Sequence, residues 1–131
     1  MPHLTLEYSS VLDSRCDMSA VARAAYDALR QTGIFPLAGI RVRLHRADFA
    51  IVADDHPDNS FLAMKLSVGA GRSTDALQAA GAAVFDAVRE NLAEVLSTPH
   101  FALSLEIREI NPDLSWKDTP IHARLTKRTD A

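Results

Sequence analysis

Proline at position 2 is the first residue of this sequence whose chemistry could depend on its place in the chain. Methionine is normally removed before a small residue or proline, and removal of Met1 would leave Pro2 with a free secondary amine. Burial or a nearby guanidinium lowers the pKa of such an amine, which makes the neutral base available at pH 7. Pro2 is therefore a candidate general base. A proline in second place is common and usually inert, so this position alone assigns no function.

Arg72 is the second candidate, because it closes the glycine-rich segment Gly69-Ala70-Gly71 at the predicted start of a helix. Free backbone N–H groups and the helix dipole favour an anion there, and a guanidinium adds a bidentate partner for a carboxylate or phosphate. The segment has neither the ending of a nucleotide-binding P-loop nor the full GxGxxG pattern. Two interpretations stay open, an anion site and a solvated arginine beside a helix cap.

Arg41 is the third candidate, and it lies in a strand pattern where apolar residues alternate with Arg41, Arg43 and His45. This alternation places Arg41 on the sheet face opposite to Pro2. Arg41 is therefore either a surface arginine or part of a site formed between subunits. The five histidines are scattered without the spacing of a zinc site, and the single cysteine, Cys16, excludes an internal disulfide.

The elements that must position these residues are predicted from periodicity and helix caps. Alternating apolar residues predict strands near 3–9, 40–45, 61–68 and 101–110. Helical spacing predicts a helix over 17–31, capped by Asp17 and ended before Gly33, and another over 73–97, capped at Ser73. The order strand-helix-strand thus occurs twice, in units of about 2–48 and 60–110.

This order predicts an α+β fold in a single domain over residues 1–131, with 111–131 as a C-terminal extension. Each unit crosses over right-handedly, so the two units together form a four-stranded sheet with two helices packed on one face. The other face carries Thr5, Glu7, Arg43, Lys65, Glu106 and Arg108. Such a mixed face is either solvated or an interface between subunits, and the pattern leaves both open.

Composition excludes several classes of protein for this chain of 131 residues, which is 47% hydrophobic and 24% charged. Its 17 acidic and 14 basic side chains give a net charge of −3, which argues against a nucleic-acid partner. No apolar run approaches the roughly 18 residues of a membrane span. The first residues lack the basic and apolar regions of a signal peptide, so we expect a cytoplasmic protein.

One continuous run, Thr-Gly-Ile-Phe-Pro-Leu-Ala-Gly-Ile-Arg over residues 32–41, is long and specific. Other motifs accompany it at the spacing found in one known family: Pro2-His3, Gly69-Ala70-Gly71-Arg72-Ser73, Ala102-Leu103-Ser104-Leu105-Glu106-Ile107, Trp116-Lys117 and Ile121-His122-Ala123. Together these motifs span nearly the whole chain. The sequence resembles the 5-carboxymethyl-2-hydroxymuconate isomerase family of the tautomerase superfamily.

The resemblance implies a double β-α-β fold with a mixed sheet, assembled as a homotrimer around a central axis. It implies that Pro2 is the catalytic base, that Arg41 and Arg72 bind substrate, and that no cofactor or metal is needed. The implied reaction is a keto–enol proton shift in 5-carboxymethyl-2-hydroxymuconate, a small polycarboxylate dienol of homoprotocatechuate (4-hydroxyphenylacetate) degradation. The alternatives are a related tautomerase acting on another unsaturated keto acid and a non-catalytic anion-binding oligomer.

Overall fold

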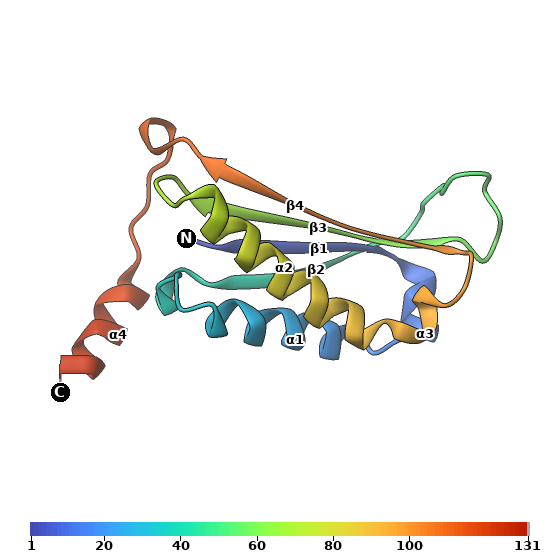
Figure 1. The fold of residues 1–131 in the computed structure, drawn as a ribbon, viewed down its shortest axis with the longest axis horizontal. Helices are drawn as coiled ribbons and strands as arrows, with labels where there is room; N and C mark the ends of the chain where they lie inside the picture. Colours follow the sequence, from blue (N-terminus) through green and yellow to red (C-terminus); the bar gives the residue numbers. More distant parts are fainter. Residues whose placement is uncertain (131) are drawn as a thin grey trace.

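A four-stranded sheet in the order β2-β1-β3-β4 forms the centre of the protein (Figure 1). The computed structural model describes residues 1–130, with side chains as far as Thr126. The strands are β1 (His3–Ser9), β2 (Arg41–Ala47), β3 (Ser60–Gly69) and β4 (Phe101–Ile110). β1 is parallel to β2 and antiparallel to β3, and β3 is parallel to β4. The predicted α+β fold with a mixed sheet is therefore confirmed.

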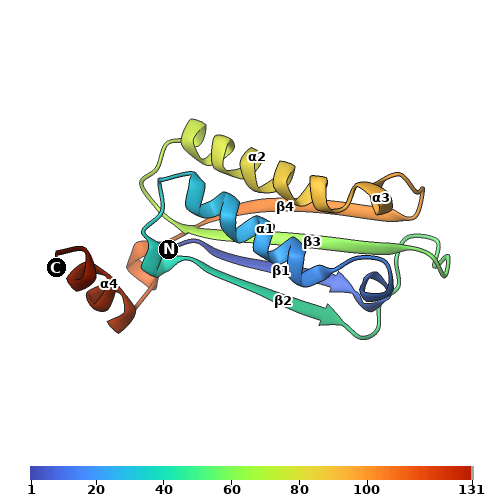
Figure 2. The same cartoon turned by 90° about the horizontal axis from the view of Figure 1, so that it is seen from below.

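Two long helices, α1 (Met18–Gln31) and α2 (Thr74–Asn91), lie on the same face of the sheet (Figure 2). Both begin at the predicted caps, because the side chains of Asp17 and Ser73 accept backbone N–H bonds at 3.2 and 3.1 Å. Gly33 follows α1 with a φ of 71°, the left-handed conformation that ends many helices. Local signals in the sequence therefore set where these helices begin and where α1 ends.

The helix predicted over 73–97 is interrupted, and this part of the prediction is wrong. α2 ends at Asn91, Leu92 has φ −120° and ψ 19°, and a short helix, α3 (Ala93–Leu96), follows. Leu92 and Val95 are both buried. The change of direction keeps these two side chains in the core as the chain turns toward β4, and this burial outweighs continuation of a straight helix.

The core lies between the helices and the sheet, where the strand register aligns apolar side chains in rows. Leu4 lies beside Val42 and Leu66 in the register, and Leu4 and Leu66 are fully buried. Burial of a leucine contributes about 1.5–3 kcal/mol, so the central strands β1 and β3 are held firmly. Pro2 continues the alternation of β1 and is fully buried as well.

The chain beyond β4 forms a further helix, α4 (Pro120–Asp130), within the segment predicted only as an extension. It projects from the end of the sheet where the N-terminus lies (Figures 1 and 2). There it contacts the 3₁₀ turn Leu37–Gly39. None of the helices in the described part of the chain is long and apolar enough to cross a membrane.

Candidate active site

The start of the chain packs against two glycines at one end of the sheet. A Cβ atom added to Gly39 would lie 3.2 Å from Cα of Met1 and 3.4 Å from Cδ of Pro2. A Cβ added to Gly69 would lie 3.9 Å from the nitrogen of Met1 and 3.8 Å from Nη1 of Arg72. Because Gly39 has no side chain, Met1 and Pro2 approach the turn closely. Gly69 lies close to both the Met1 amine and the guanidinium of Arg72.

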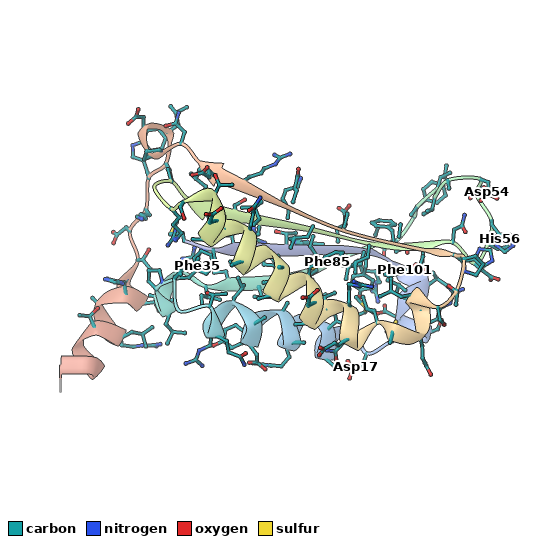
Figure 3. The ribbon with its side chains drawn as sticks, viewed as in Figure 1. Asp17, Phe35, Asp54, His56, Phe85 and Phe101 are labelled. Atoms are coloured by element: carbon teal, nitrogen blue, oxygen red, sulfur yellow. The ribbon has the colours of Figure 1, made fainter. Side chains whose placement is uncertain are left out.

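Arg72 is half-buried and held by backbone carbonyl groups. Its Nε and Nη2 donate to the carbonyl of Ile34 at 3.2 and 3.1 Å, and its Nη1 donates to the carbonyl of Gly69 at 3.3 Å. The guanidinium carbon lies 4.7 Å from the ring centre of Phe35, which Figure 3 labels at this end of the molecule. Arginine has five N–H donors, so these three bonds leave two for an anion. This burial and these bonds favour an oriented cation over a solvated arginine beside a helix cap.

Arg41 lies beside the start of β1, because the parallel register pairs His3 with Arg41. Its backbone N–H donates to the carbonyl of Pro2 at 3.0 Å, and its Nη1 hydrogen-bonds to Nε2 of His3. Arg41 and His3 lie on the open face, as the alternation predicts, whereas Pro2 faces the helices. The opposite parity does not separate Arg41 from the chain start, since both lie at the same end of the sheet.

Positive charges surround the amino group at this end of the sheet. Burial lowers the pKa of the Met1 amine below its usual value, and the charges of Arg72, Lys117 and Arg41 lower it further, in that order. A group with a lowered pKa keeps more of its neutral, basic form at pH 7. Lys117 received no role from the sequence pattern, although it belongs to the Trp116-Lys117 motif of the family resemblance.

A cavity of about 330 Å³ opens beside the amino group. It is lined by Met1, Pro36, Ala38, Gly39, Lys117, Thr119 and His122. One wall comes from the turn before β2 and the other from the segment that leads into α4. The volume lies in the range of small-molecule sites. Met1 and Lys117 line the cavity, and the charges of Arg72 and Arg41 act on the same amine from outside its lining. The arrangement can receive a small anion and transfer a proton.

A second cluster of polar side chains lies at the far end of the sheet, where Figure 3 labels His56. The rings of His56 and His100 stack with centroids 4.2 Å apart, and with Asp58 they offer ligand atoms within 4.8 Å of one another. Arg15 pairs with Asp58 at 3.6 Å, and Asn59 contacts Nδ1 of His100 at 3.0 Å. The sequence showed these histidines as scattered, because only folding brings the loop before β3 to the start of β4. The cluster is remote from the amine.

The two β-α-β units and the buried chain start among cations define a tautomerase-like protein. A sequence profile of the 5-carboxymethyl-2-hydroxymuconate isomerase family matches residues 2–125 of this chain. The chain belongs to this 5-carboxymethyl-2-hydroxymuconate isomerase family.

Three relatives show how far the similarity extends. The 5-carboxymethyl-2-hydroxymuconate Delta-isomerase of Escherichia coli is 37% identical over 123 residues, which cover 94% of this chain and 98% of that protein. A crystal structure of a 5-carboxymethyl-2-hydroxymuconate isomerase from Deinococcus radiodurans R1 is 33% identical, with a TM-score of 0.87 over 95% of this chain and 93% of that one. A fused 4-OT symmetric trimer shares the fold, with a TM-score of 0.63 at 20% identity, over 92% of this chain and 97% of that one.

Proposed function

We propose that this protein is an isomerase that moves a proton in 5-carboxymethyl-2-hydroxymuconate, with Pro2 as the general base. The observation that carries the proposal is the half-buried amino group of Met1, which lies beside the fully buried Pro2, near the charges of Arg72, Lys117 and Arg41 and at the edge of a cavity. Membership of the isomerase family and the 37% identity to the Escherichia coli enzyme supply the substrate. We place the reaction in the cytoplasm and assign it to the whole chain acting as one domain.

The proposed reaction begins with removal of Met1, because the nitrogen of Pro2 is otherwise an amide without basicity. The neutral Pro2 amine takes the proton of the enolic hydroxyl, the C=O bond forms, and the electron pair moves along the diene. A C–H bond then forms at carbon as the proton is returned, so the substrate and product have the same atoms and oxidation state. Such acid–base transfer contributes about 10²–10⁴-fold in rate. It requires a base and cations, and no cofactor or metal takes part.

The two arginines are proposed to bind the carboxylates and to stabilise the dienolate. Among the residues that the structure describes, two N–H groups of Arg72 donate to no carbonyl, and its guanidinium is already oriented by Ile34, Gly69 and Phe35. Orienting the cation before the substrate binds removes a cost of reorganisation in the transition state. Arg41 supplies a second cation near the chain start.

Replacement of the proposed base is the decisive test. Pro2→Ala leaves a primary amine with different geometry and basicity, so we expect kcat to fall by about 10²-fold or more. Steady-state assay of dienol consumption measures this effect, and intact mass establishes that Met1 is absent from both proteins. Retention of Met1 in an active enzyme, or full activity of Pro2→Ala, would contradict the role of Pro2.

Replacement of Arg72 tests substrate binding separately from the base. Arg72→Ala removes a charge-assisted contact, so we expect kcat/KM to fall about 10–100-fold, chiefly through KM. Arg89→Ala, which removes an exposed arginine from α2, is the matched control and is expected to leave the kinetics unchanged. Thermal unfolding of both variants shows whether loss of the bonds to Ile34 and Gly69 also weakens the fold. Equal kinetics in Arg72→Ala and Arg89→Ala would defeat the assignment.

The proposed assembly is a homotrimer in which the open sheet faces pack together. A row of Arg43, Thr5, Lys65 and Glu106 crosses the four strands on this face. Lys65 and Glu106 approach to only 3.9 Å within the chain, and both are exposed. Charged groups of both signs on a face without helices can pair with those of another copy. The face also holds a hollow of about 460 Å³, which includes Ala63.

A further inference from the structure

Lys117 lies where the segment after β4 returns to the start of the chain. This segment carries Lys117 and Thr119 into the wall of the cavity that Met1 also lines. The position follows from the fold, because β4 and β1 belong to the same sheet and β4 ends near the beginning of β1 (Figure 1). Lys117 is therefore a neighbour of the proposed base in space, although it is remote in sequence.

The charge of Lys117 is not neutralised within the described part of the chain. Its side chain is exposed, and it forms no ion pair or hydrogen bond among the side chains that the structure describes. The described residues that line the cavity include no carboxylate. The effect of Lys117 on the Met1 amine exceeds that of Arg41, which indicates that its charge reaches the amine. An ammonium with three N–H donors is available there for an anionic ligand.

The proposed substrate has more carboxylates than the two arginines can bind one to one. Muconate is a dicarboxylate, and the carboxymethyl group adds a third carboxylate on a separate arm. A carboxylate that enters a cavity without a cation loses hydration without compensation. The third carboxylate therefore needs a cation other than Arg41 and Arg72, and Lys117 lines the cavity itself.

We propose that Lys117 binds the carboxylate of the carboxymethyl arm and so makes the site select a tricarboxylate over a dicarboxylate. This inference rests on the proposed function, and it adds a specificity-determining residue to the same site. Lys117 is a point charge on a flexible stem, which suits a carboxylate on a rotatable arm. Arg72, whose guanidinium is held by three hydrogen bonds, suits a carboxylate on the rigid diene.

The test compares two substrates that differ only in this arm, 5-carboxymethyl-2-hydroxymuconate and 2-hydroxymuconate. We expect Lys117→Met to raise KM for the tricarboxylate about tenfold and to leave KM for the dicarboxylate unchanged. Loss of the charge near the amine should change kcat equally for both substrates, by less than about threefold. Lys117→Arg keeps the charge and should recover most of the affinity. Arg124→Met removes a cation from an exposed position of α4 outside the cavity lining, and it should leave both substrates unaffected.

Equal rises in KM for both substrates in Lys117→Met would overturn the proposal, as would an equal effect of Arg124→Met, which would indicate a long-range charge effect. Binding of unreactive acids gives a readout that does not depend on turnover. Calorimetric titration should show propane-1,2,3-tricarboxylate binding more tightly than glutarate to the wild type, and Lys117→Met should remove the difference. If the wild type turns over neither dienol, the proposed function fails, while this titration still decides the role of Lys117: equal affinity of the two acids refutes it.

Discussion

His3 illustrates how one proton position can set the geometry of a binding cation. Arginine has no acceptor, so Nη1 of Arg41 donates to Nε2 of His3, and His3 must be neutral with its proton on Nδ1. Burial lowers the pKa of His3 first, and the charges of Arg41, Arg43 and the amino terminus lower it further. Protonation of His3 would place a donor against the guanidinium and release Arg41 from this orientation.

The lowered pKa of His3 predicts a pH-dependent stability. Between the folded pKa and the unfolded value of 6.5, the unfolded chain binds more protons, so stability rises with pH up to about 6.5 and then levels off. Urea unfolding at pH 5.5 and 7.5 should show His3→Gln losing less stability on acidification than the wild type. Partial exposure of His3 limits the difference to about 0.5 kcal/mol.

The control for this experiment is His45→Gln, which removes an exposed histidine of β2 from the same sheet face. It should follow the wild-type pH dependence. Identical slopes for the wild type and His3→Gln would show that the hydrogen bond between Arg41 and His3 does not contribute to the pH response.

At the scale of elements, the approach of α2 to β4 depends on a glycine. A Cβ added to Gly81 would lie 3.1 Å from Cδ1 and 3.9 Å from Cγ1 of Ile107. Glycine inside a helix costs up to about 1 kcal/mol relative to alanine, so its presence here needs a packing reason. The close contact with Ile107 supplies that reason and brings the helix onto the edge strand.

Enlarging this position should therefore destabilise the fold. We expect Gly81→Val to lower the free energy of unfolding by about 1–3 kcal/mol, because a whole isopropyl group must enter the space beside Ile107. Ala82→Val, on the exposed side of the same helix, should cost about 0.5 kcal/mol from helix propensity alone. Urea unfolding midpoints measure both. Costs of equal size would show that the contact between α2 and β4 is not tight.

At the scale of the whole molecule, α1 and α2 both cover one face of the sheet and leave the other face open (Figure 2). We expect light scattering to give about three times the chain mass of 14.3 kDa. Ala63→Arg, which adds a long charged side chain to the hollow on this face, should shift the protein toward monomer. Ala82→Arg, on the outer side of α2, should not change the mass. A wild-type protein that scatters as a 14.3 kDa monomer would contradict the proposed assembly.

The elements that could be predicted from the sequence are those with local signals. Alternation in β1 and the caps at Asp17 and Ser73 depend on residues a few positions apart, and the structure confirms them. The break at Leu92 was missed, because it depends on packing against β4 and on no breaker residue nearby. The helix α4 was missed as well, since its short pattern is polar and its contact with the turn Leu37–Gly39 joins segments far apart in the sequence.

The candidate site, too, could be predicted only in part from the sequence. Residue types alone identified Pro2, Arg41 and Arg72 as capable of base and cation chemistry, since amines and guanidinium groups have these properties in any chain. Their gathering at one end of the sheet, and the position of Lys117 beside them, came only from folding, because β1 must first pair with β2 and β3, and β3 with β4. Desolvation and charge effects on the amine depend on distances in space and not on separation along the chain, which is why the lowered pKa belongs to the folded molecule.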